Sequence, residues 1–219
     1  MIKAIVFDFD GVIIDTETPL FASWQEIFST YNAHLEVSIW TKTIGTAIHF
    51  DFCQHLEDIT GMAFDRDKLT TQRRQRYLDL VDAEPLLPGV AEYIESAERH
   101  GLSLGVASSS DEKWIVGHLT ERGLLARFDA VKSRDHVEKA KPEPDLFLAA
   151  VEALGVRPEE AIAIEDSANG VTAAKRAGLY TVAVPNPMTR DLELDHADRI
   201  IDSLADTPLP QLLQQANDL

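Results

Sequence analysis

KAIVFDFDGVIID, residues 3–15, is the stretch that decides the fold. The apolar run at residues 5–7 predicts a strand buried on both faces. Asp8 and Asp10 follow it directly, at the carboxyl end where open α/β sheets bind their ligands. Two carboxylates this close need a compensating cation, because like charges repel. Carboxylate oxygens are ligands that suit Mg²⁺. The alternative is a strand that ends in an ordinary polar turn, with Gly11 supplying a positive φ.

Composition narrows the class of protein. The chain has 219 residues, 45% hydrophobic and 26% charged, which is typical of one good-sized domain or of a domain with an insertion. Its single cysteine, Cys53, excludes an intrachain disulfide. We find no signal-like leader and no long apolar run, so we expect a cytoplasmic protein without a membrane partner. A net charge of −17 disfavours nucleic acid as a partner.

Residues 16–83 show only helical patterns. Thr18 and Pro19 predict a helix start, with a hydroxyl N-cap followed by proline at the first helical position. Three further short helices are expected, with turns at Gly45 and Gly61. The aromatic side chains of this segment are interpreted as its own small core. The sequence therefore predicts a compact helical module.

From about residue 84 onward, strands and helices alternate. We expect strands at residues 102–107, 128–132, 161–164, 180–184 and 199–201, with helices between them, one of them at residues 142–154, and a last helix at 209–216. Alternation of this kind predicts an α/β fold with a doubly wound parallel sheet.

Polar side chains follow several of these strands. Because the carboxyl ends of parallel strands lie at one edge of the sheet, we expect the following residues to meet there: Asp8, Asp10, Ser108, Glu165 and Asp166. Lys141, in a loop before a helix, can join them. The set has the parts that phosphoryl transfer needs, namely a nucleophile, carboxylates for a metal and donors for phosphate oxygens. Taken singly, Ser108 also fits a helix N-cap and Lys141 a surface lysine.

Four motifs carry a family resemblance. They are DFDGVIIDTE at residues 8–17, VASSS at 106–110, AKPEPDLF at 140–147 and IEDSANGVTAAKRAG at 164–178. In order and spacing they resemble the motifs of the haloacid-dehalogenase superfamily, in its β-phosphoglucomutase-like phosphatase branch. The resemblance implies a Rossmann-like core at residues 1–15 and 84–219, with an inserted helical cap at residues 16–83.

The resemblance also implies roles for individual residues. Asp8 would be the nucleophile that forms an aspartyl-phosphate, and Asp10 the general acid and then the general base. Ser108 and Lys141 would hold the phosphate. The residues implied for a Mg²⁺ site are Asp8, Asp10 through its main-chain carbonyl, Asp166 and, in support, Glu165.

The chain departs from the mutases of this branch in the helical insert. Those mutases have a histidine shortly after the first motif and an arginine in the cap, whereas here Leu20 stands at the first position and residues 46–49 contain no arginine. We therefore expect a phosphatase acting on a small phosphorylated substrate. The alternatives are a phosphosugar mutase, in which Lys42, Lys68 or the arginines within residues 73–76 replace the missing one, and a non-catalytic phosphate-binding protein, which would need no general acid.

Overall fold

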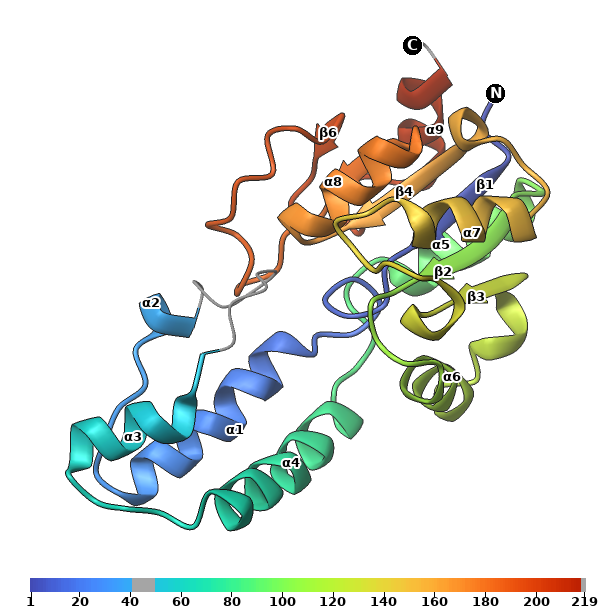
Figure 1. The fold of residues 1–219 in the computed structure, drawn as a ribbon. Coiled ribbons are helices and arrows are strands. Elements are labelled where there is room, and N and C mark those ends of the chain that lie inside the picture. The colour runs from blue at the N-terminus through green and yellow to red at the C-terminus, as the bar shows by residue number, and fades with distance from the viewer. Residues whose placement is uncertain (41–49, 218–219) are drawn as a thin grey trace. The chain divides into compact units, whose positions relative to one another are not determined.

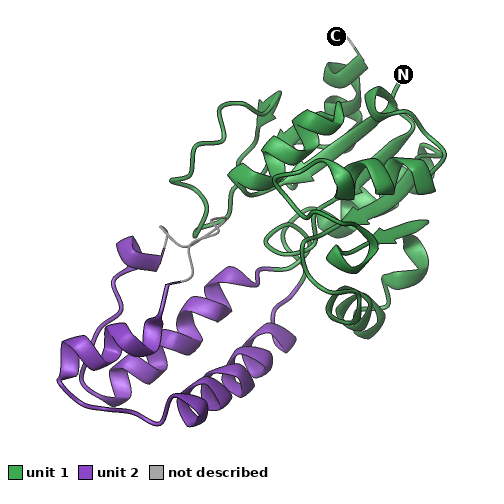
Figure 2. Cartoon of the chain, in the orientation of Figure 1, with its two compact units in different colours: residues 1–14, 86–219 green, residues 15–85 purple. Residues whose placement is uncertain are grey.

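The computed structural model of the chain describes residues 1–40 and 50–217. They form two compact units, residues 1–14 with 86–219 and residues 15–85 (Figure 2). The turn expected at Gly45, the alternative cation Lys42 and the segment 46–49 lie outside the described residues.

The larger unit is built on a six-stranded parallel sheet with the strand order β3-β2-β1-β4-β5-β6 (Figure 1). Its strands are β1 (Ala4–Phe7), β2 (Ser103–Ala107), β3 (Ala130–Lys132), β4 (Ala161–Glu165), β5 (Tyr180–Ala183) and β6 (Arg199–Ile200). This order confirms the predicted doubly wound sheet, with the first strand at its centre. The strand order reverses beside β1, and such a switch point is where sheets of this class bind ligands.

Helices flank this sheet. They are α5 (Val90–Arg99), α6 (Glu112–Glu121), α7 (Asp145–Ala153), α8 (Ala168–Ala177) and α9 (Leu209–Asn217), with the 3₁₀ turns η1 (Leu125–Arg127), η2 (Arg134–His136) and η3 (Pro158–Glu160). The prediction that α7 begins at Pro142 was wrong, because the helix begins at Asp145. Lys141 and Glu143 each precede a proline, which disfavours helical backbone at both positions.

Both faces of the central strand are buried. Ala4 and Val6 belong to the core that α7 and α8 cover, together with Phe147 of α7. Successive side chains of a strand point to opposite faces, so Phe7 points to the other face of the sheet. There it meets Phe128 edge-on, with ring centroids 6.1 Å apart. A one-residue slip would exchange the two faces, so burial fixes the register of the strand.

The smaller unit consists of α1 (Glu17–Thr30), α2 (Val37–Trp40), α3 (Phe52–Thr60) and α4 (Arg66–Asp82). Its aromatic residues form its core as predicted. The centroid of the Phe52 ring lies 5.1 Å from the ring centroids of both Trp24 and Trp40. Gly61 ends α3 at a φ of 68°, in agreement with the predicted turn.

The predicted start of α1 was wrong. The helix begins at Glu17, and Thr18 donates its backbone N–H to Asp15 Oδ1 at 2.9 Å instead of acting as the N-cap. Pro19 is accommodated two positions further in, at the third helical position, because the N–H groups of a first helical turn have no partner within the helix. Among residues 1–40 and 50–217, none of the helices has the length and apolar character needed to cross a membrane.

Candidate active site

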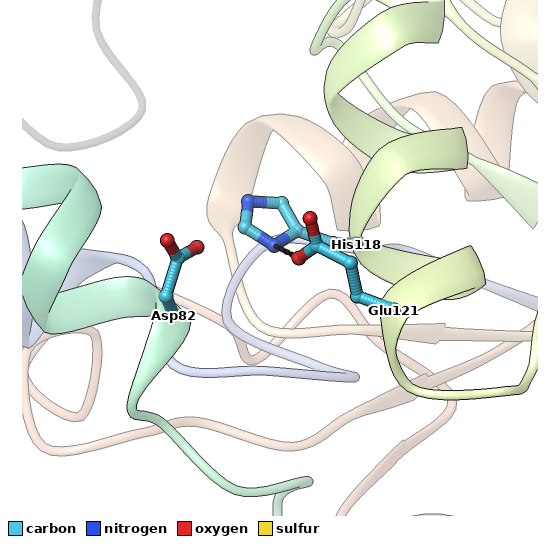
Figure 3. A group of neighbouring side chains, drawn as sticks. All are labelled: Asp82, His118 and Glu121. Atoms are coloured by element: carbon cyan, nitrogen blue, oxygen red, sulfur yellow. Dashed lines mark ion pairs between the residues drawn. The ribbon is translucent and has the colours of Figure 1, made fainter.

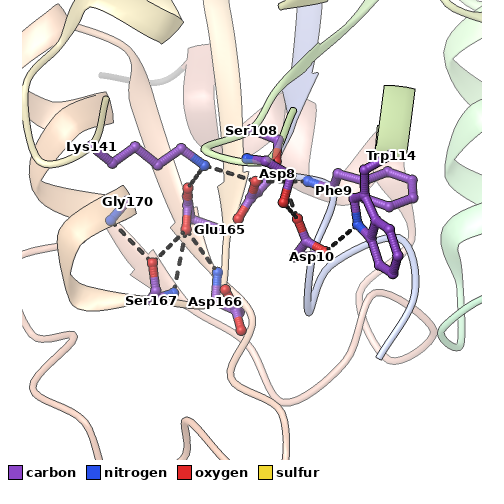
Figure 4. A network of polar contacts seen from close by, with 11 residues as sticks. Asp8, Phe9, Asp10, Ser108, Trp114, Lys141, Glu165, Asp166, Ser167 and Gly170 are labelled. Atoms are coloured by element: carbon purple, nitrogen blue, oxygen red, sulfur yellow. Dashed lines mark hydrogen bonds and ion pairs between the residues drawn. The ribbon is translucent and has the colours of Figure 1, made fainter. Parts of the chain in front are cut away.

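The register of the sheet brings the ends of three strands level. Phe7 of β1 lies beside Val106 of β2 and Ile164 of β4. The residues that follow are therefore neighbours at one edge of the sheet, and the structure brings together all six predicted site residues (Figure 4), namely Asp8, Asp10, Ser108, Lys141, Glu165 and Asp166.

Lys141 forms a buried bridge between two strands. Its Nζ lies 2.8 Å from Asp8 Oδ1 and 2.5 Å from Glu165 Oε1, and the three side chains are 6%, 10% and 0% exposed. The ammonium also lies 5.2 Å from the centre of the Phe147 ring. The alternative of a surface lysine is therefore wrong. Asp8 Oδ1 additionally accepts the backbone N–H of Phe9 at 2.7 Å.

The charges of this cluster are not balanced by protein groups alone. Burial raises the pKa of Asp8 to about 8, against the attraction of Lys141 and with the added repulsion of Glu165 and Asp10. Burial would lower the pKa of Lys141, but Asp8 and Glu165 outweigh it and hold that pKa above its usual value. Oxygen atoms of Asp8, Glu165 and Asp166 lie within 4.8 Å of one another. Three buried carboxylates beside one ammonium fit a small divalent cation with oxygen ligands.

Glu165 is held by four donors. Its Oε1 accepts from Lys141, while its Oε2 accepts from Asp166 N at 3.1 Å, Ser167 N at 3.3 Å and Ser167 Oγ at 3.2 Å. Three of the four donors share Oε2, whereas Lys141 is the one donor on Oε1 among the described residues. Glu165 thus contacts Lys141 directly, and its place among metal ligands stays a prediction.

Asp166 is oriented by two residues at the same edge. Asn186, in the loop after β5, donates Nδ2 to Asp166 Oδ2 at 2.7 Å. Gly11 has a φ of +77°, as the turn hypothesis expected, and a Cβ there would lie 2.2 Å from Asp166 Oδ2. Only glycine fits this position. Sequence reasoning missed Asn186, because no site residue was predicted after β5 and Asn186 belongs to none of the four motifs.

The carboxylate of Asp10 is bound by the segment that joins β2 to α6 and by the first turn of α6 (Figure 4). Its Oδ2 accepts from Ser110 Oγ at 2.6 Å and from Ser108 Oγ at 3.2 Å, and its Oδ1 accepts from Trp114 Nε1 at 3.0 Å. Ser108 does not cap the helix, because Asp111 does so by accepting the backbone N–H of Trp114 at 2.8 Å. Ser110 and Trp114 were missed by sequence reasoning, although Ser110 stands within the second motif and Trp114 on the first turn of the next helix.

The arginines considered as substitutes for the arginine of the mutases have different surroundings in the smaller unit. Arg76 forms a two-pronged ion pair with Glu26, at 2.7 and 2.8 Å. Arg73 lies 5.6 Å from the Trp24 ring centre and 5.8 Å from that of Tyr77, and burial lowers its pKa. Its Nε is buried without a hydrogen-bond partner among the described residues.

Known proteins resemble this chain along almost all of its length. The model of the family described as haloacid dehalogenase-like hydrolase matches residues 5–184. YhcW of Bacillus subtilis (strain 168) is 44% identical over 217 residues, 99% of either chain. Hexitol phosphatase B of Escherichia coli (strain K12) is 33% identical, with 97% of either chain covered. The crystal structure of CbbY from Rhodobacter sphaeroides in complex with phosphate has a TM-score of 0.72 at 29% identity, covering 94% of this chain and 96% of CbbY.

Proposed function

The chain belongs to the haloacid dehalogenase-like hydrolase family, and from this premise we propose that it is a Mg²⁺-dependent phosphatase that hydrolyses a small phosphorylated metabolite. A sugar phosphate or a similar phosphomonoester is the proposed substrate, and an aspartyl-phosphate on Asp8 is the proposed intermediate. One observation carries the proposal: Lys141 Nζ lies 2.8 Å from Asp8 Oδ1 and 2.5 Å from Glu165 Oε1, with all three side chains buried. A buried cation on a carboxylate at a strand end is suited to phosphoryl transfer.

The first step is attack by Asp8 on the phosphorus. Within the described residues, both the hydrogen bond and the ion pair of Asp8 lie on Oδ1, so Oδ2 is the attacking oxygen. A bond forms between Oδ2 and phosphorus while the bond from phosphorus to the bridging oxygen of the substrate breaks. Asp10, as the carboxylic acid, gives its proton to that oxygen, so an alcohol leaves instead of an alkoxide. Lys141 offsets the charge of Asp8 and orients its carboxylate.

The second step is hydrolysis of the aspartyl-phosphate. Asp10, now the carboxylate, takes a proton from a water molecule, whose oxygen attacks the phosphorus. The bond between phosphorus and Asp8 Oδ2 breaks, inorganic phosphate forms, and both carboxyl groups return to their starting states. Ser108 and Lys141 are the residues we propose to hold the phosphate oxygens during both steps.

We propose that Mg²⁺ is held by Asp8, Asp166 and the main-chain carbonyl of Asp10, with Glu165 as the remaining member of the predicted set. When bound, the ion supplies positive charge that reduces the repulsion between Asp8 and the phosphate. The cluster of Asp8, Glu165 and Asp166 supports this assignment, because its oxygens lie within 4.8 Å of one another. We further propose that residues 1–15 and 84–219 form the catalytic core, that residues 16–83 form the cap that sets specificity, and that the protein acts in the cytoplasm.

The deciding experiment separates hydrolysis from isomerisation. Purified protein with Mg²⁺ is assayed for phosphate release against sugar phosphates, nucleotides and small phosphoesters. A coupled assay follows conversion of β-glucose 1-phosphate to glucose 6-phosphate in parallel. We expect phosphate release without a bisphosphorylated activator, because Leu20 cannot donate a hydrogen bond to a second phosphate. Isomerisation faster than phosphate release would establish the mutase instead, and activity in neither assay would favour a binding protein.

A further inference from the structure

Trp114 stands out among the donors that surround Asp10. Its indole Nε1 donates to Asp10 Oδ1 at 3.0 Å, while Ser110 and Ser108 donate to Asp10 Oδ2 at 2.6 and 3.2 Å. We propose that Trp114 is the positioning residue of Asp10, holding its carboxyl group in one orientation through the hydrogen bond to Oδ1. This inference rests on the proposed function, in which Asp10 is the general acid and base.

The chemistry of the three donors explains why the indole has a special role. An indole N–H can only donate a hydrogen bond, whereas a serine hydroxyl can rotate and either donate or accept. Asp10 must alternate between carboxylic acid and carboxylate during turnover. The indole N–H donates to Oδ1 in either state, so it keeps the same orientation of the carboxyl group throughout turnover.

The position of the Trp114 ring is fixed by its neighbours in the same unit. The ring meets that of His118 edge-on, at 4.2 Å between centroids and an angle of 80°. His118 is buried and lies parallel to the ring of Phe9, 6.1 Å away. His118 Nδ1 is in turn 3.1 Å from Arg122 Nη1. It also lies 3.8 Å from Glu121 Oε2 (Figure 3). The indole is therefore a rigid donor, and rigidity is what a positioning residue contributes to proton transfer.

The competing explanation is that Trp114 only fills space beside His118. Trp114→Phe distinguishes the two, because phenylalanine keeps an aromatic ring in the same place but removes the N–H. A residue that acts through the general acid should matter most where the leaving group needs a proton. An alkyl monophosphate has such a leaving group, whereas p-nitrophenyl phosphate leaves as a stable anion and needs little protonation.

The test compares kcat/KM for an alkyl monophosphate and for p-nitrophenyl phosphate in the full-length protein with Mg²⁺. General acid catalysis contributes roughly 10²- to 10⁴-fold, and we expect Trp114→Phe to lose part of it, about tenfold for the alkyl substrate and less than about twofold for p-nitrophenyl phosphate. Asp10→Ala should show the same selectivity with a larger loss. Ser109→Ala is the matched control, because Ser109 is exposed and makes no contact with Asp10 among the described residues. Trp114→Leu also removes the N–H and replaces Trp114→Phe if that variant does not fold.

Two results would overturn the inference while leaving the proposed function intact. An unchanged kcat/KM for the alkyl substrate would show that the N–H is dispensable, and equal losses on both substrates would show that Trp114 has only a packing role. Failure of the proposed function looks different. Full activity of Asp10→Ala on the alkyl substrate would remove the general acid itself, and with it the role of Trp114.

Discussion

Replacing Gly170 by alanine puts a methyl group where the carboxyl group of Glu165 lies. An ideal Cβ on Gly170 would be 1.9 Å from Glu165 Cδ and 2.0 Å from each carboxylate oxygen, whereas ordinary Cβ contacts begin at 3.4 Å. Glu165 must therefore move by about 1.5 Å. Lys141 Nζ lies 2.5 Å from Glu165 Oε1, so this displacement removes the contact that holds Lys141 beside Asp8.

The expected change in the free energy of unfolding combines opposing effects. Gly170 lies in α8 at a φ that alanine adopts readily, and alanine is favoured over glycine within a helix by about 1 kcal/mol. Overpacking a buried site costs about 1–3 kcal/mol, and loss of hydrogen bonds to a buried carboxylate costs about 1.5–3 kcal/mol. Gly170→Ala should therefore lower the free energy of unfolding by about 3 kcal/mol. Misplacement of Lys141 should lower phosphatase activity about 100-fold.

Gly117→Ala provides a matched control. Gly117 lies within α6, and a Cβ there would meet nothing within 4 Å. Helix propensity then acts alone, so this variant should gain up to about 1 kcal/mol and keep its activity. Urea denaturation gives the free energy of unfolding of both variants, and phosphate release gives their activity. If Gly170→Ala were as stable and as active as Gly117→Ala, the tight fit between Gly170 and Glu165 would not exist.

Three further predictions concern the nucleophile, the metal and pH. Asp8→Asn should fold normally and release phosphate at less than about a tenth of the parent rate, because it lacks the attacking oxygen; a higher rate measured on folded protein would contradict the covalent route. Exhaustive chelation should abolish phosphate release, Mg²⁺ should restore it and excess Ca²⁺ should inhibit it, since Ca²⁺ takes six to eight ligands and could bind both oxygens of Asp8; full activity after chelation would remove the metal assignment. Hydrogen bonds from Lys3 and Arg157 lower the pKa of Glu160 from 4.5 to about 2. The stability that Glu160 contributes is therefore present above pH 4.5 and lost as the pH falls towards 2, so Glu160→Gln should lower the urea midpoint at pH 7, and by progressively less between pH 4.5 and 2. A difference in midpoint that does not change with pH would contradict that ionic origin.

Much of the architecture was accessible from local patterns. Buried strands are short apolar runs, helices repeat at a different period, and the polar residues that interrupt each strand mark its carboxyl end. The parallel sheet, its strands and the meeting of Asp8 with Glu165 follow from those patterns. Helix starts were less accessible, because competing acceptors such as Asp15 and closely spaced prolines such as Pro142 shift them by a few residues.

The amino-acid sequence predicts that four carboxylates and a serine meet at one edge of one sheet, because the ends of parallel strands lie together, and that Lys141 can join them. The contacts that each side chain makes there come from the tertiary structure. It places the Lys141 ammonium between Asp8 and Glu165, aims the indole of Trp114 at Asp10 and brings Asn186 to Asp166. These contacts depend on burial, on side-chain rotamers and on the close approach of Gly11 and Gly170. Such quantities arise from packing between segments far apart in the chain, and no periodicity along the chain records them.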